Sequence, residues 1–80
     1  MKAHDLKIKT CFFLEVINGK KTFELRYNDR DYRVGDILLL REYDGDYTGH
    51  IAIVEVTSLL KEHDGLKPGF VNMSTKLLWS

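Results

Sequence analysis

Polar side chains suited to ligand binding alternate along one short stretch of the chain. Thr22, Glu24 and Arg26 are two residues apart, and side chains two apart in a β-strand lie on the same face. Arg26 offers a planar set of donors to a phosphate or carbonyl, and Glu24 accepts from an exocyclic amine. Lys21, immediately before them, adds a point charge. This spacing predicts one wall of a polar cleft; the alternative is a solvated strand face on which Glu24 and Arg26 partly neutralise each other.

Other candidate ligand contacts lie on either side of this row. Arg30 and Arg33 follow it, and we expect them to contact phosphate groups at the rim of the cleft. With the neighbouring tyrosines they also fit a surface for single-stranded nucleic acid, although nearby aspartates would repel phosphates. His4 alternates with Leu6 and Ile8, which favours a partly buried histidine bonded to a backbone carbonyl. The alternative is a base at the edge of the cleft.

The sequence offers little for metal-dependent or covalent catalysis. Its three histidines have no metal-ligand spacing, so we expect neither a metal nor a cofactor. No nucleophile elbow or Ser-His-Asp order is present. Cys11 is the single cysteine, so an intramolecular disulfide is excluded, which fits a reducing cytoplasm. We expect Cys11 itself to be a small buried residue of the core. No apolar run approaches the length of a membrane span.

Length and charge limit the fold and its partners. A chain of 80 residues forms one domain, whose small core leaves little room for a deep enclosed active site. Apolar residues make up 44% of the chain and charged residues 30%, as in a folded globular protein. The 12 basic and 12 acidic side chains balance, with 8 basic and 6 acidic in residues 1–40. This weak positive bias suits a few phosphate contacts and argues against a broad nucleic-acid footprint.

Hydrophobic spacing predicts several short strands and one helix. Thr10 is the expected N-cap of a helix over Cys11–Asn18, which Asn18-Gly19 would stop. Strands are expected over residues 4–9, 22–27, 37–43, 50–58 and 70–75, with a hairpin loop at 44–49 and an irregular segment at 59–69. The predicted fold is mainly β (α+β), a small barrel of about five to six strands with one short N-terminal helix.

The end of the chain is expected to differ from the rest. The predicted domain covers residues 1–75, followed by a C-terminal tail at 76–80. The tail holds Leu77, Leu78 and Trp79, which need a partner surface because they are large and apolar. We expect a monomer or a weak homodimer.

Several short motifs stand in a characteristic order along the chain. They are Gly19-Lys20-Lys21-Thr22, then Glu24 and Arg26, then Val34-Gly35-Asp36 at the head of an apolar strand. In this order they resemble the ASCH-type domains of the PUA-like superfamily. The opening His4-Asp5-Leu6-Lys7-Ile8, the run Asn28-Asp29-Arg30-Asp31-Tyr32 and the ending Gly65-Leu66-Lys67-Pro68-Gly69-Phe70-Val71 are similar, more narrowly, to uncharacterised ASCH-related proteins common in bacteriophages and prophages.

The resemblance implies a PUA-like β-barrel with a helix closing one side and a cleft beside the Gly-Lys-Lys-Thr turn that binds RNA or a modified base. Some ASCH proteins are amidohydrolases that remove an acyl group from acetylated cytidine with a lysine, a threonine and a distant glutamate. Lys21 matches that lysine. Glu24 stands where the threonine would fall, and no glutamate follows Glu62. A carboxylate does not replace a hydroxyl nucleophile, so this departure argues against the same hydrolysis.

The expected function is an RNA- or nucleotide-binding module with a cleft lined by Lys21, Thr22, Glu24 and Arg26. One alternative is an amidohydrolase-like enzyme acting on a modified nucleobase, with Lys21 and Glu24 as an acid–base pair. The other is a protein-interaction module of phage origin that uses the apolar tail.

Overall fold

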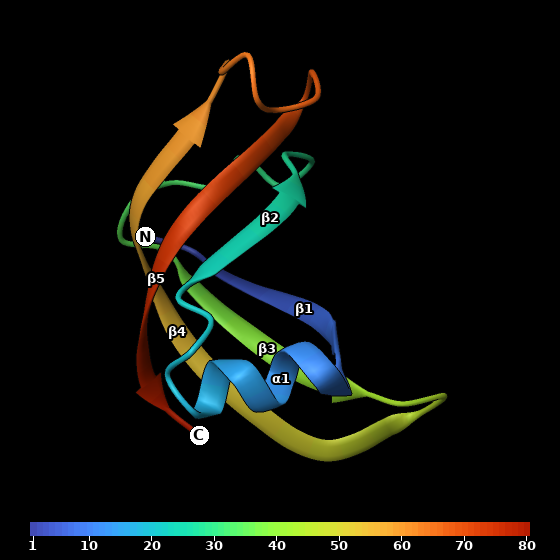
Figure 1. The fold of residues 1–80 in the computed structure, drawn as a ribbon. Helices are drawn as coiled ribbons and strands as arrows, with labels where there is room; N and C mark the ends of the chain where they lie inside the picture. Colours follow the sequence, from blue (N-terminus) through green and yellow to red (C-terminus); the bar gives the residue numbers. More distant parts are fainter.

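The computed structural model describes the whole chain, Met1–Ser80, and contains five strands and one helix (Figure 1). The elements are β1 (Ala3–Lys9), α1 (Thr10–Ile17), β2 (Phe23–Tyr27), β3 (Ile37–Tyr43), β4 (Tyr47–Lys61) and β5 (Phe70–Trp79). The prediction of a mainly β domain with one short N-terminal helix is confirmed. The one helix is too short to cross a membrane.

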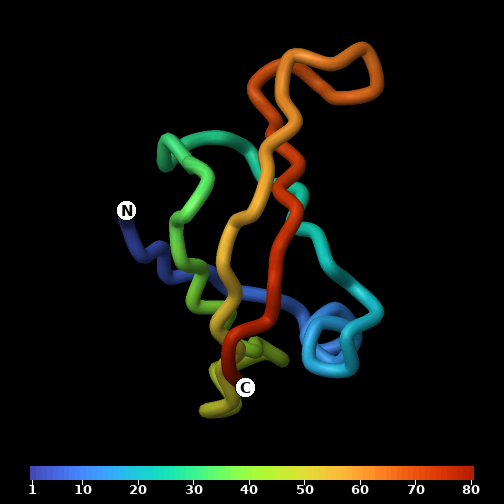
Figure 2. Tube along the Cα trace, turned by 90° about the vertical axis from the view of Figure 1, so that its left-hand side faces the viewer, coloured from blue at the N-terminus to red at the C-terminus, as the bar shows by residue number.

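All five strands belong to one sheet in the order β1-β3-β4-β5-β2. β1 runs parallel to β3, and the other neighbouring pairs are antiparallel. The long strands β4 and β5 run side by side and curl the sheet into a half-barrel (Figures 1 and 2). Bulges between Ile53 and Val54 and between Val56 and Ser58 interrupt this pair, and such bulges bend and twist a sheet. The outermost strands, β1 and β2, are not paired with each other, so the sheet is open between them.

The core fills the concave side of the half-barrel. Alternate residues of β3 and β4 point inward, and Leu38, Leu40, Val54 and Val56 are almost completely buried. The helix α1 contacts β1, β3 and β4 and adds Phe13 and Val16 to the core. Those two residues are three apart, which places them on one helical face. The helix thereby closes one end of the sheet (Figure 1).

The helix begins one residue earlier than predicted. Thr10 is its first residue and Lys9 is the N-cap, without a side-chain capping bond, so the prediction of Thr10 as N-cap is wrong. The predicted stop is confirmed: Asn18 is the C-cap and Gly19 has φ +75°, a conformation that glycine adopts without steric cost. The prediction of a buried Cys11 is also wrong, because its position on α1 is exposed.

The second half of the chain contains longer strands than the sequence predicts. β4 covers Tyr47–Lys61, so the irregular segment shrinks to residues 62–69. β5 continues to Trp79, which lies opposite Ile53, and the prediction that this strand ends at Thr75 is wrong. Pairing with β4 supplies backbone partners for residues 76–79 that no local sequence signal announces. Their apolar side chains nevertheless face solvent, and Trp79 is 57% exposed.

Candidate ligand-binding cleft

A cleft of about 570 Å³ lies between the end of β1, the helix and the first half of β2. It is lined by Lys7, Ile8, Lys9, Phe12, Glu15, Lys20, Lys21, Phe23, Glu24, Leu25 and Arg26. The turn that follows Gly19 brings both lysines of the Gly-Lys-Lys-Thr motif to its wall, since the amides of Lys20 and Lys21 each donate to the carbonyl of Glu15. The cleft therefore lies beside this motif.

The centre of the cleft wall is an ion-paired triad. Glu24 is only 3% exposed because β2 turns alternate side chains inward. Its Oε1 lies 2.5 Å from Lys21 Nζ, and its Oε2 lies 3.0 Å from Arg26 Nε. Lys21 Nζ also donates to the carbonyl of Phe23 at 2.6 Å. One buried carboxylate thus fixes the position of two cations, and the triad keeps a net charge of +1.

The rest of the lining makes the cleft more positive. Five of its side chains are basic and two are acidic, which gives a net charge of +3. Lys9 and Lys20 take part in none of the ion pairs of the structure. Lys7 is held differently, with Nζ 4.1 Å from the centre of the Tyr43 ring. A cleft with unpaired cations around a fixed triad is suited to an anionic ligand.

Arginine side chains bridge the opening between β1 and β2. The carbonyl of Lys2 accepts from the amide of Ile37, so the carbonyls of Asp5 and Lys7 point to the opposite, unpaired edge of β1. Arg26 Nη2 donates to the Lys7 carbonyl and Arg30 Nη1 to the Asp5 carbonyl, each at 3.0 Å. These bonds satisfy edge groups that would otherwise attract another strand.

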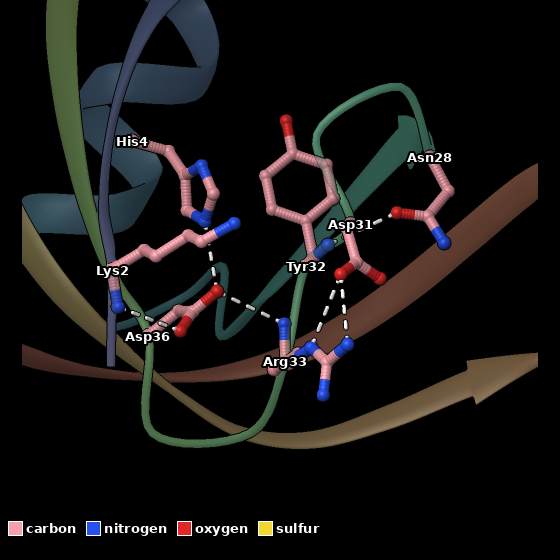
Figure 3. Close-up of polar contacts among 7 residues, drawn as sticks. All are labelled: Lys2, His4, Asn28, Asp31, Tyr32, Arg33 and Asp36. Atoms are coloured by element: carbon pink, nitrogen blue, oxygen red, sulfur yellow. Dashed lines mark hydrogen bonds and ion pairs between the residues drawn. The ribbon is translucent and has the colours of Figure 1, made fainter.

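His4 belongs to a separate buried cluster (Figure 3). Its Nε2 lies 2.8 Å from Asp36 Oδ2, and the backbone amides of Lys2 and Arg33 donate to the same carboxylate at 3.0 Å. Tyr32 packs against the imidazole with the ring centres 4.8 Å apart. Burial opposes ionisation of Asp36, but the bonds from His4, Lys2 and Arg33 outweigh it and lower the pKa of Asp36 below its usual value. The partner of His4 is therefore a carboxylate, not the expected backbone carbonyl.

The structure gathers only part of the predicted set into the cleft. Lys21, Glu24 and Arg26 line it, whereas Thr22 precedes β2 and is exposed. Arg30 lies farther along the same opening. Arg33 is outside the cleft, where its Nη2 pairs with Asp31 Oδ2 at 2.9 Å.

Several residues that line the cleft were not predicted from the sequence. Lys7 and Lys9 alternate with buried residues of β1, which predicts only a solvated charged face. Phe12 and Glu15 lie on the exposed side of α1 and also line the cleft. The only sequence feature that links Phe12 and Glu15 to the cleft is their position shortly before the Gly-Lys-Lys-Thr turn. β1 and β2 are the end strands of the sheet, and the curl of the sheet brings these segments together.

A second carboxylate–histidine contact lies at the hairpin between β3 and β4. Buried Glu42 accepts from Thr48 Oγ1 at 2.6 Å and contacts His50 Nδ1 at 3.0 Å. The bond from Thr48, with a further contribution from His50, lowers the pKa of Glu42 although burial opposes it. No group of three or more His, Cys, Asp or Glu side chains is arranged to hold a metal ion.

Comparison with the sequences of known proteins places this chain in a family. Residues 3–75 match the model of a domain of unknown function, DUF3850. The chain is also similar to the uncharacterised 12.9 kDa protein in the GpA 3′ region of Escherichia phage P2, with 36% identity over 67 residues, or 82% of this chain. The match spans 62% of the length of the phage protein. The chain therefore belongs to the DUF3850 family, and a phage protein is among its relatives.

Proposed function

We propose that this protein is a binding module for RNA or a nucleotide-like ligand, and that the cleft beside the Gly-Lys-Lys-Thr turn holds the ligand. The observation that carries the proposal is the triad of Lys21, Glu24 and Arg26 in a cleft with a net charge of +3. Lys9 and Lys20 at its border would contact phosphate oxygens. The resemblance to ASCH-type domains of the PUA-like superfamily supports the same ligand class.

The geometry of the triad favours binding over chemistry. Both oxygens of Glu24 are occupied, one by Lys21 and the other by Arg26. A general base needs a free oxygen within reach of the proton that it removes. In the proposed module, the carboxylate orients the two cations, and the remaining donors of Arg26 face the ligand.

The direct test is replacement of an arginine that contacts the ligand. Arg26→Ala should weaken binding of a short RNA by about 10- to 100-fold, because it removes hydrogen bonds from a charged donor. Amide chemical-shift titration of the labelled protein should show shifts clustered at residues 20–26 in the unmodified chain. The affinity should depend only shallowly on salt, with a log–log slope of about −2, because few cations face the ligand.

Matched variants separate a binding effect from a folding effect. Arg33→Ala removes an exposed arginine outside the cleft that pairs with Asp31 and should leave the affinity unchanged. A Lys9→Ala/Lys20→Ala double variant breaks no ion pair of the structure and should weaken binding without loss of stability. Equal affinity of this double variant and the unmodified protein would contradict the proposed cleft.

The close contact between Lys21 Nζ and Glu24 Oε1 at 2.5 Å supports one further candidate. In this candidate, a substrate with an amide of a modified nucleobase would displace Lys21 from Glu24, and the two groups would then act on it as an acid–base pair. Turnover of an acylated cytidine that disappears in Lys21→Ala would favour this enzyme over a binding module. Absence of turnover at every pH between about 5 and 9 would exclude that substrate class, since the interval spans the usual range of general bases.

A further inference from the structure

The outer face of β2 carries a row of exposed apolar side chains. Phe23, Leu25 and Tyr27 alternate with the inward-pointing residues and are 47%, 52% and 57% exposed. Alternate side chains on a strand are about 7 Å apart, so the row spans about 14 Å. Phe23 and Leu25 also line the cleft, and Tyr27 lines a second pocket of about 590 Å³ formed by the loop between β4 and β5. The row therefore connects the cleft with this loop pocket.

The Tyr27 ring packs against two neighbours. It meets the Phe70 ring edge to face, with ring centres 5.6 Å apart and planes at 80°. Gly69 lies so close that a Cβ at this position would be 2.7 Å from Cε1 of the tyrosine, so a larger residue here would displace the ring. More than half of Tyr27 nevertheless remains accessible. An accessible aromatic ring is suited to stacking on another planar ring.

Cations and a polar amide accompany the row. Lys21 Nζ lies 4.8 Å from the centre of the Phe23 ring. At the other end, the loop pocket contains Lys61 and Lys67 together with two carboxylates, so it suits single phosphates more than a dense polyanion. Asn72 lies beside Leu25 on β5, but its Oδ1, which has no hydrogen-bond partner in the protein, is buried and not open to a ligand.

We propose that single-stranded RNA bound in the cleft continues along the outer face of β2, with bases stacked on Phe23 and Tyr27 and a phosphate near Lys61 or Lys67. This inference rests on the proposed function, because the cleft anchors the strand. Stacking on aromatic side chains and contact with scattered lysines are the chemistry by which proteins bind single strands with little sequence preference.

The experiment compares a ligand that fills only the cleft with one long enough to follow the row. Binding of uridine monophosphate and of a uridine hexanucleotide is measured by chemical-shift titration for the unmodified protein and three variants. The hexanucleotide should bind more tightly than the monophosphate. Tyr27→Ala and Tyr27→Leu should weaken the hexanucleotide about 5- to 100-fold, the range for loss of one stacked base, and leave the monophosphate unchanged.

The matched control is Tyr47→Ala. Tyr47 is 55% exposed and packs edge-on against Tyr43 at 5.2 Å, but it lies at the β3–β4 hairpin, far from the loop between β4 and β5 (Figure 1). Tyr27→Leu keeps an apolar side chain at this position but removes the aromatic ring. A loss of hexanucleotide affinity in both Tyr27 variants is therefore due to the missing ring and not to a folding defect.

The outcomes separate the two proposals. Binding of the monophosphate with no higher affinity for the hexanucleotide would overturn the stacking row but not the cleft. Equal losses of hexanucleotide affinity in the Tyr27 variants and in Tyr47→Ala would have the same meaning. Failure of both ligands to bind would overturn both. Self-association that depends on Tyr27, with no binding of the hexanucleotide, would assign the row to contact between copies and overturn the RNA path.

Discussion

Replacement of Asp36 by alanine should lower the free energy of unfolding by about 3 to 5 kcal/mol, because three hydrogen-bond donors would lose their common buried carboxylate acceptor. The carboxylate is 2% exposed and accepts bonds from His4 Nε2 and from the amides of Lys2 and Arg33. These bonds connect the start of β1 to the turn before β3 (Figure 3). A domain of this size has a total stability of about 4 to 12 kcal/mol, so the variant should be close to unfolded. Urea denaturation followed by circular dichroism measures the difference.

Two further variants show whether the carboxylate itself is responsible. Asp36→Asn offers one acceptor oxygen where three donors converge, and it should lose a smaller part of the stability. Asp29→Ala, in the exposed loop just before, should change the stability by less than about 0.5 kcal/mol. A stability of Asp36→Ala equal to that of Asp29→Ala would contradict the structural role of the cluster.

Asp36 also predicts how stability responds to acid. Its pKa in the folded chain is below the ordinary value of 3.8, so the unfolded chain binds a proton first as the pH falls. The stabilisation from Asp36 is therefore fully present above the ordinary pKa and is lost as the pH falls through the lower pKa of the folded state. Denaturation midpoints measured from neutral pH downward should decrease in this acidic range, and Asp36→Asn should show a weaker decrease.

Replacement of Glu24 by alanine is the second change with a large expected effect. It should cost about 2 to 4 kcal/mol of stability, because Lys21 and Arg26 would remain side by side without their common counter-charge. Their side chains are only 11% and 26% exposed, so water compensates for the loss only in part. Thermal unfolding measures the effect, and the cleft should also lose its order, since Glu24 fixes both cations.

Glu15 supplies the matched control for this variant. It is the other carboxylate of the cleft lining, is exposed and takes part in no ion pair. Glu15→Ala should therefore leave the stability within about 0.5 kcal/mol of the unmodified protein. Equal melting temperatures for Glu24→Ala and Glu15→Ala would show that the triad contributes nothing to the fold.

Sequence reasoning succeeds where the physical cause is local. The continuous apolar run Ile37–Leu40, between a turn signal and a hairpin loop, predicts β3 at its observed bounds, Ile37–Tyr43, because a short apolar run bounded by turns is typical of a buried strand. Asn18-Gly19 ends the helix, because both residues tolerate a conformation that other residues avoid. The alternation of Phe23, Leu25 and Tyr27 predicts that Glu24 and Arg26 share the other face of β2, and the structure shows that this shared face points inward.

It fails where the cause is a partner distant in the sequence. Thr10 has the chemistry of an N-cap, but its backbone continues as helix, and Lys9 takes the N-cap position without a side-chain capping bond. Trp79 becomes part of β5 because β4 extends far enough to pair with it. Cys11 is exposed because the buried face of α1 is set by Phe13 and Val16. Propensity and composition carry no information about such pairings.

The sequence by itself therefore determined the mainly β class, the single helix and the clustering of Lys21, Glu24 and Arg26 in one short stretch, because local spacing controls each of them. Only the tertiary structure decided that Lys7 and Lys9 of β1 reach the same cleft and that Asp36, 32 residues away, is the partner of His4. It also decided that Arg26 and Arg30 bridge the open edge of β1. The reason is that strand order, with β1 and β2 at opposite ends of a curled sheet, fixes which distant side chains meet.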